Sequence, residues 1–470
     1  MGKRVQAVEA VGAQGHGAES GNHSPARRRP PGRKPGPAPD YIGFGRQLLA
    51  LIRHAFPLFN LWLDALPDAR RQELCVYLGR HLWWQPLLMF LLRNGSRNAF
   101  DGDRNSGLLP ANMTQLTDAP WDTERLGQRR TVTCSGNVTR HLSRTSVPAV
   151  ARLLLLMIGR LLDMRLLESA RLFDRWWIIA VDGTLQDRGR KTEHGQARYR
   201  YVVEAKLLGP NGTMFAVMTE FANMHDPIRD KEDCELKAFL RLAERLHNAF
   251  PRRSICLLFD GLYPVEAVFD RIDSYGWKFI ATLREGRQPT AWDEAVQTML
   301  MSPELMLRSQ RRSDEGRIEQ TLRWTRHIPF GKHTFDVLFC GEIAPASATL
   351  WVWVTNFDLN ADNVEPVANR GGRAREGIES VFNVEKNGGF GLEHAFCAND
   401  TAAENYHLIM QVAHVLGQLL VNGLFRRLIQ ACRKVSDVKL IQLLRTSLFT
   451  VPIDPDLPVF GQLRFVRSTA

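Results

Sequence analysis

Two short apolar runs, each followed by the dipeptide Asp-Gly, constrain the fold of this chain more than any other feature. The first run covers residues 177–181 and ends at Asp182, and the second covers residues 255–259 and ends at Asp260. Apolar runs of this length, bounded by turn residues, predict buried strands of an α/β sheet. Acids at the ends of such strands face the crevice where α/β folds bind ligands. We therefore predict an α/β fold with both aspartates in its site, a simple turn being the alternative at each Asp-Gly.

The segments around these runs predict further elements of the same sheet. Residues 199–221 are typical of a hairpin, because two strand-like runs flank a Pro-Asn-Gly turn within residues 209–212. Helices are predicted over residues 231–249 and 264–274, and a strand over residues 277–282. Together with the two apolar runs, these segments give the order β-β-β-α-β-α-β.

Changes in composition divide the chain into segments. Residues 1–40 hold six prolines and a run of arginines, which cannot form a core, whereas the next segment has apolar residues at helical spacing. Residues 315–357 are β-rich. The predicted units are a disordered basic arm (1–40), a mostly helical N-terminal domain (41–175), a first part of the α/β core (176–300), a β-rich insertion (301–360), a second part of the core (361–435) and a C-terminal tail (436–470).

A third candidate acid lies on a predicted helix. Arg375, Glu379 and Lys386 are separated by four and seven positions. At about 100° per residue they fall near 0°, 40° and 20°, and so share one face of the helix. This stripe makes Glu379 the third candidate acid. A stripe of surface ion pairs is the alternative.

The balance of charge and apolar residues narrows the class of protein. The chain carries 61 Lys and Arg against 50 Asp and Glu, a net charge of +11 that favours a polyanionic partner. Its most apolar helical stretch, residues 407–425, contains several polar residues, so we predict a buried helix and no membrane partner. Seven cysteines without a C-x-x-C pair and no apolar stretch within residues 1–40 predict a cytoplasmic protein.

Taken together, these motifs resemble the DDE transposases of bacterial insertion sequences, specifically the insertion-sequence-4-like branch. Residues 178–184 resemble the strand of the first aspartate, and residues 257–263 resemble that of the second. Arg375-x3-Glu379-x6-Lys386 matches the R, E and K of the branch signature Y-x2-R-x3-E-x6-K. The resemblance covers about residues 176–427. It departs from the signature at Gly372, which stands where the tyrosine is expected.

The resemblance implies an RNase H-like catalytic core with a β-rich insertion, preceded by a helical domain for DNA binding and assembly. Asp182, Asp260 and Glu379 would be the catalytic acids and would hold two Mg²⁺ or Mn²⁺ ions. Arg375 and Lys386 would bind DNA phosphates. The enzyme would cleave transposon-end DNA and transfer the freed 3′-hydroxyl into target DNA as a homodimer assembled on DNA. It would be located at the bacterial nucleoid.

The sequence suggests further DNA contacts and leaves two other functions open. Arg323, Trp324 and Arg326 place an indole between two guanidiniums, which fits base stacking and phosphate binding, although a strand with its Trp in the core is the alternative. Glu235 is one of several acids near the two aspartate motifs, and the sequence assigns it no role. The other functions are an RNase H-like nuclease without strand transfer and a decayed DNA-binding derivative without catalysis.

Overall fold

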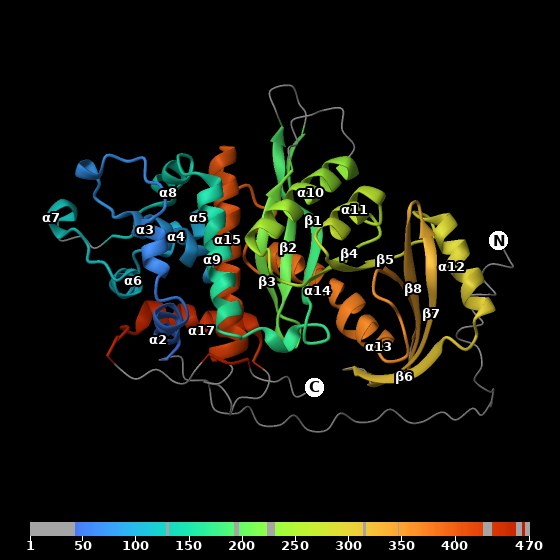
Figure 1. The fold of residues 1–470 in the computed structure, drawn as a ribbon. Helices are drawn as coiled ribbons and strands as arrows, with labels where there is room; N and C mark the ends of the chain where they lie inside the picture. Colours follow the sequence, from blue (N-terminus) through green and yellow to red (C-terminus); the bar gives the residue numbers. More distant parts are fainter. Residues whose placement is uncertain are drawn as a thin grey trace, which may run out of the picture.

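The computed structural model describes residues 43–127, 131–191, 197–222, 231–313, 316–345, 347–425, 435–456 and 463–465. A helical part made by the first third of the chain lies beside a twisted sheet flanked by helices, and the long helix α15 (Asp400–Leu419) stands between them (Figure 1). The basic arm predicted over residues 1–40 lies outside the described residues. A mixed α/β fold with a helical N-terminal third is therefore confirmed.

The N-terminal helices pack around apolar side chains that are almost all buried. Helix α15 joins this core, because it packs against α4 and α9. The helical segments are α2 (Phe44–Ala50), η1 (Leu51–Ala55), α3 (Phe59–Asp64), η2 (Gln72–Leu74), α4 (Gly79–Leu91), α5 (Arg97–Asp103), α6 (Leu109–Thr117), α7 (Thr123–Leu126), α8 (Ser135–Leu142), α9 (Val147–Asp163) and η3 (Glu168–Ala170).

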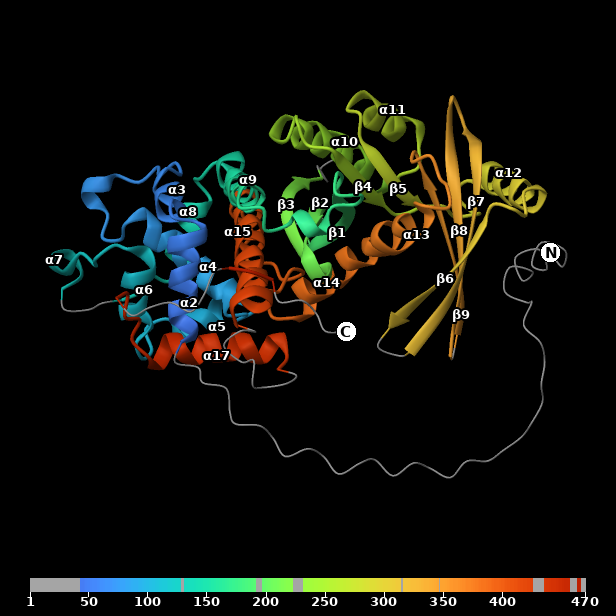
Figure 2. The same ribbon diagram turned by 60° about the horizontal axis from the view of Figure 1, so that its bottom comes forward.

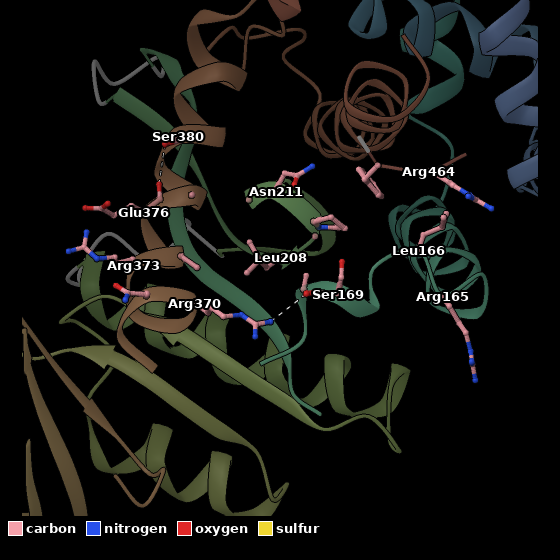
Figure 3. A pocket seen from close by; sticks show the side chains of 18 residues that line it. Arg165, Leu166, Ser169, Leu208, Asn211, Arg370, Arg373, Glu376, Ser380 and Arg464 are labelled. Atoms are coloured by element: carbon pink, nitrogen blue, oxygen red, sulfur yellow. Dashed lines mark hydrogen bonds between the residues drawn. The ribbon is translucent and has the colours of Figure 1, made fainter. Parts of the chain in front are cut away.

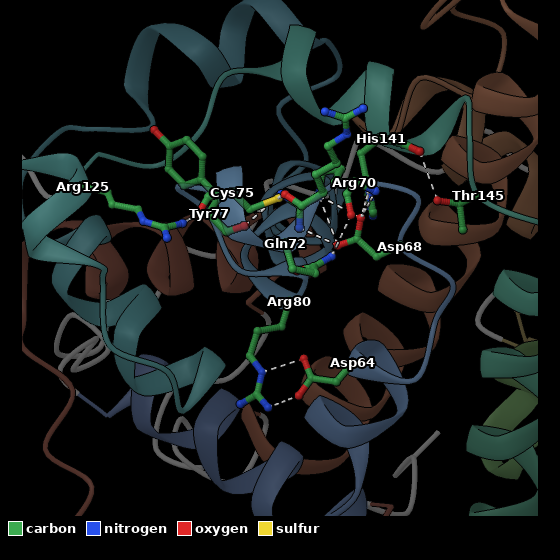
Figure 4. A network of polar contacts seen from close by, with 11 residues as sticks. Asp64, Asp68, Arg70, Gln72, Cys75, Tyr77, Arg80, Arg125, His141 and Thr145 are labelled. Carbon is green, nitrogen blue, oxygen red and sulfur yellow. Dashed lines mark hydrogen bonds and ion pairs between the residues drawn. The ribbon is translucent and has the colours of Figure 1, made fainter.

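Polar contacts hold the irregular connection between α3 and α4 (Figure 4). Arg70 Nε donates a hydrogen bond to Asp68 Oδ1 at 2.8 Å, and its Nη1 donates to the carbonyl of Tyr77 at 2.8 Å. Arg80, on α4, pairs with Asp64 at the end of α3. These arginines donate hydrogen bonds to carbonyl and carboxylate groups that lie outside the hydrogen bonding of the helices. These bonds fix the path of the connection.

The strands form one sheet of nine, in the order β3-β2-β1-β4-β5-β9-β8-β7-β6. Strand β1 pairs antiparallel with β2 and parallel with β4, and β4 pairs parallel with β5. The order β-β-β-α-β-α-β predicted from the sequence is thereby confirmed for the first five strands. The strands are β1 (Trp177–Lys191), β2 (Ala197–Leu208), β3 (Met214–Phe221), β4 (Ile255–Phe259), β5 (Lys278–Thr282), β6 (Met306–Ser313), β7 (Gly316–Phe330), β8 (His333–Ala344) and β9 (Ser347–Thr355).

The β-rich segment extends the main sheet. Ile280 and Ala281 of β5 pair antiparallel with Thr355 and Val354 of β9, and β8, β7 and β6 follow outward from β9. These strands lie at the end of the sheet far from the helical part (Figure 2). Helix α12 (Pro289–Met301) packs against β7, although the sequence analysis grouped it with the first part of the core.

Helices flank both sides of the first five strands. In Figure 2, α10 (Lys231–Ala249) and α11 (Glu266–Ser274) lie above these strands, and α14 (Glu376–Asn387) lies below them. The predicted helices at residues 231–249 and 264–274 are thus confirmed to within two residues. The remaining helical segments are η4 (Pro210–Gly212), α13 (Val364–Pro366), η5 (Val367–Gly371), η6 (Gly372–Arg375), η7 (Leu420–Phe425) and α17 (Asp437–Thr450).

The most apolar helix is buried, as predicted. Within the described part of the chain, Asp400–Phe425 is the single continuous helix long and apolar enough to cross a membrane, and 83% of its apolar window is buried. The segment predicted as a C-terminal tail contains a packed helix, α17. Its Ser447 hydroxyl accepts a hydrogen bond from the amide of Gly45 at 3.0 Å, which joins it to the N-terminal helices.

Candidate acidic active site

Asp182 lies inside a strand, whereas the sequence predicted that the strand would end at this position and a turn would follow. Strand β1 continues past Asp182 because β2 pairs with it, with Asp182 opposite Glu204. The parallel pairing with β4 has already stopped at Ala180, opposite Leu258. Asp182 therefore lies just beyond the carboxyl end of β4, beside the crevice that the sequence analysis proposed.

Asp260 directly follows β4, as predicted. One oxygen of its carboxylate, Oδ1, accepts a hydrogen bond from the amide of Leu262 at 2.8 Å, which holds the side chain against its own turn. The other oxygen, Oδ2, lies 4.0 Å from Nη2 of Arg284. The position after a short, fully buried strand gives this carboxylate a rigid support.

Glu379 is connected to Asp182 through a shared guanidinium. Arg375 lies at the junction of η6 and α14, and its Nη2 donates a hydrogen bond to Asp182 Oδ2 at 3.0 Å. Its Nη1 donates to Glu379 Oε1 one helical turn further along. The structure thus brings the first acid and the acid on the helix together, with the cation predicted to bind phosphate lying between them.

Burial raises the pKa of Asp182 to about 6. The charge of Arg375 opposes this effect, and the negative charges of Asp260 and Glu235 add to it. Both carboxylates therefore lie close enough to Asp182 for their charges to act on it. The region is acidic and partly shielded from water, which are conditions that favour a bound cation.

This raised pKa predicts a pH dependence of stability. Asp182 has an ordinary pKa of 3.8 when unfolded, so its folded form binds a proton more tightly. Folding is therefore favoured at low pH, and this contribution is lost as the pH rises through about 6. The shift corresponds to about 3 kcal/mol at about 1.4 kcal/mol per pH unit. Urea unfolding in EDTA should show Asp182→Asn gaining up to that much over the wild type between pH 4 and 7, whereas parallel pH profiles would contradict the assignment.

Lys386 and the arginines of β7 do not contact the three acids. Lys386 Nζ pairs with Glu393 at 3.1 Å. Arg323 donates a hydrogen bond to the carbonyl of Met299 at 2.9 Å. The DNA contacts predicted for Lys386, Arg323 and Arg326 therefore stay predictions.

Trp324 is in the hydrophobic core, which corrects the stacking role predicted for it. Its side chain is 4% exposed, so a base cannot stack on its ring. The residue points inward because the side chains of β7 alternate between the two faces of the sheet. The neighbouring Arg326 is exposed and donates a hydrogen bond to the carbonyl of Leu359 at 3.2 Å.

Gly372, at the signature tyrosine position, is packed against a tryptophan ring. A Cβ atom on Gly372 would lie 2.4 Å from Cε2 of Trp353, a residue that is 2% exposed. The indole of Trp353 fills the space into which a side chain at position 372 would project. The departure from the signature therefore has a packing reason in this chain.

This contact predicts that any side chain at position 372 lowers the stability of the protein. Gly372→Ala should lower the free energy of unfolding by about 1–3 kcal/mol, because the buried indole and the helix must move apart. Gly102→Ala is a matched control, since nothing lies within 4 Å of a Cβ atom there. Urea unfolding of both variants measures the difference, and equal stability of the two would show that the indole yields without cost.

A large cleft lies between α14 and the segments around Ser169 and Asn211 (Figure 3), and its lining does not include the three acids. It measures about 910 Å³, and α14 contributes Glu376 and Ser380 to its lining. Arg370 in its wall donates a hydrogen bond to the carbonyl of Arg171 at 2.7 Å, and Arg373 pairs with Glu342. These guanidiniums connect η5 and η6 to the segment before β1 and to β8.

The chemistry of the three acids fits a hard divalent cation. Carboxylate oxygens are the ligands that Mg²⁺ and Mn²⁺ prefer. Among the described residues, no group of three or more His, Cys, Asp and Glu side chains is already arranged around one ion position. In this arrangement, Arg375 supplies the positive charge beside Asp182 and Glu379.

No family model matches the chain, and no curated protein matches it significantly.

Proposed function

We propose that this chain is a DDE transposase that cleaves DNA at transposon ends and transfers the 3′-hydroxyl into target DNA. The observation that carries the proposal is the arrangement of Asp182, Asp260 and Glu379. Asp182 lies on β1 just past its pairing with β4, Asp260 follows β4, and the glutamate is linked to Asp182 through Arg375. Their positions in the chain are far apart, so this arrangement is a property of the fold.

The sheet supports an RNase H-like core. Its first three strands form an antiparallel meander, and β4 and β5 lie parallel to β1 on the other side. Helix α10 connects the meander to β4, and α14 brings the third acid to the same edge. The four strands between α12 and α13 correspond to the β-rich insertion that the resemblance implies.

The acids and the cation have separate roles in the proposed reaction. Two bound Mg²⁺ ions would activate the attacking oxygen and stabilise the leaving oxygen of an in-line displacement. Asp182, Asp260 and Glu379 would hold them. Arg375 would exchange its carboxylate partners for DNA phosphate, whose geometry suits the guanidinium fork. Water is the first attacking group, and the freed 3′-hydroxyl is the second.

The partners follow from the same proposal. The net charge of +11 provides attraction to transposon-end and target DNA. Joining of two ends requires a homodimer assembled on DNA. A nuclease without strand transfer would use the same acids, but it would not need the helical N-terminal part and the β-rich strands, which suit recognition and pairing of two DNA ends. A decayed derivative fits less well, because none of the three acids has been replaced.

One assay distinguishes these functions. The full chain is incubated with duplex DNA carrying the inverted repeats that flank its reading frame, with a supercoiled plasmid and Mg²⁺. Strand-transfer products in the plasmid support the transposase. Cleaved ends without joining support the nuclease, and binding without cleavage in Mg²⁺ or Mn²⁺ supports the decayed derivative. A chain that neither cleaves nor binds this DNA would contradict all three proposals.

A further inference from the structure

A fourth carboxylate, Glu235, lies beside the three predicted acids. Glu235 is on α10 and is 5% exposed. Its Oε1 accepts a hydrogen bond from the hydroxyl of Tyr263 at 2.9 Å, and its Oε2 accepts one from the hydroxyl of Tyr201. Each oxygen therefore has a donor, and the carboxylate is held in one orientation.

One tyrosine follows the second aspartate, and the other lies on the strand that pairs with the strand of the first. Tyr263 lies three positions after Asp260, and Tyr201 lies on β2 opposite Leu185 of β1. Each hydroxyl donates to one oxygen, so Glu235 bridges the two segments. The bridge ties α10 to the edge of the sheet where both aspartates are found.

Gly183 shows how closely this bridge approaches the first aspartate. A Cβ atom on Gly183 would lie 2.2 Å from the Tyr201 hydroxyl oxygen and 2.7 Å from Cδ of Glu235. The carboxyl group thus packs against the backbone of the residue that follows Asp182. A glycine is required here because any side chain would displace the bridge.

The charge of Glu235 has no cationic partner among the described residues. Among the described residues, no Lys or Arg forms an ion pair with Glu235. By contrast, Glu220 on β3 pairs with Arg241 and Arg245, which lie on the same helix α10 as Glu235. A buried carboxylate without a cation is costly to fold. The acidic site as a whole has four carboxylates, and the described guanidiniums beside them are those of Arg375 and Arg284.

We propose that Glu235 is a positioning residue whose buried charge, held by Tyr201 and Tyr263, raises the affinity of the acidic site for divalent cations. The proposal rests on the proposed function, because it assumes that Asp182, Asp260 and Glu379 bind metal ions. Glu235 acts from behind these ligands, since both its oxygens already accept tyrosine hydroxyls. Outer partners of this kind change metal affinity by about 10–100-fold.

Mn²⁺ binding to the full chain tests the proposal without requiring catalysis. Glu235→Gln keeps the shape of the side chain and removes its charge. Electron paramagnetic resonance of free Mn²⁺ should show about tenfold or greater loss of affinity in this variant. Glu220→Gln, the matched control on β3, should bind Mn²⁺ like the wild type, because the charge of Glu220 is already paired with Arg241 and Arg245.

The outcomes separate this inference from the proposed function. If Asp182→Asn loses Mn²⁺ binding while Glu235→Gln binds like the wild type, the role of Glu235 is wrong and the metal site stands. If the wild type binds no Mn²⁺ at millimolar concentration, both proposals fail. Should Glu235→Gln not fold, Tyr263→Phe decides, since it keeps the charge and removes one hydrogen bond. A severalfold loss of affinity supports the inference, and unchanged affinity overturns it.

Discussion

Asp182→Asn is expected to lower the rate of Mg²⁺-dependent cleavage of transposon-end DNA by about 10³-fold or more. Asparagine keeps the size of the side chain and removes the charge that would hold the metal ions, and a loss of 10³-fold corresponds to about 4 kcal/mol of transition-state stabilisation. Asp260→Asn and Glu379→Gln should have effects of similar size, because the three acids would act as one unit. Gel assays of end cleavage under single-turnover conditions measure the rates.

The matched control for these variants is Asp270→Asn. Asp270 lies on α11 and pairs with Lys332 and His333 at the surface, away from the acidic site. Its replacement should leave the cleavage rate unchanged. Retention of wild-type cleavage by Asp182→Asn or Glu379→Gln would falsify the catalytic assignment, whatever the stability of those variants.

Lys206→Met is expected to destabilise the protein by about 3–5 kcal/mol. Lys206 is fully buried on β2, and its Nζ lies 2.5 Å from Glu204 Oε2 and 2.7 Å from Glu385 Oε1. It also donates a hydrogen bond to Gln411 on α15 at 3.0 Å. Methionine fills a similar volume but leaves two buried carboxylates without a cation, which is the costly way to break a buried ion pair. Urea unfolding at pH 7 measures the loss.

Lys332→Met provides the comparison for Lys206→Met. Lys332 also contacts two carboxylates, those of Glu266 and Asp270, but its side chain is 57% exposed. Water can solvate its partners after the change, so the expected loss is much smaller than that of Lys206→Met. Similar losses in the two variants would show that burial does not control the cost.

The cluster around Lys206 also positions the predicted catalytic helix. Glu385 lies on α14 six positions after Glu379, and Lys206 joins it to β2 beside the strand of Asp182. His407 on α15 contacts Glu204 at 2.6 Å and extends the same cluster. Loss of Lys206 should therefore lower cleavage as well as stability, because α14 would lose its polar anchor to the sheet.

Elements with a regular local pattern could be predicted from the sequence. The helix at residues 231–249 is α10 as predicted, because its apolar residues recur at helical spacing and Pro251 prevents continuation. The strand ending before Asp260 was predicted for the same kind of reason, since a short apolar run followed by Asp-Gly is a local signal.

Features that depend on pairing between distant segments could not be predicted. Strand β1 runs past Asp182 because β2 pairs with it, and the β-rich segment joins the main sheet because β9 pairs with β5. The spacing of Arg375 and Glu379 placed them on one helical face, but nothing local indicated that Arg375 also reaches Asp182. Trp324 illustrates the same limit, since its role depended on which face of the sheet is covered.

The sequence alone therefore determined the candidate residues: three acids at the ends or on the faces of recognisable elements, in a basic chain. The tertiary structure decided what surrounds them. It added Glu235, whose two tyrosine partners are distant in sequence, and it filled the space beside Gly372 with the indole of Trp353. The physical reason is that backbone propensity and hydrophobic periodicity act over a few residues, whereas burial and charge pairing are defined only when distant segments pack together.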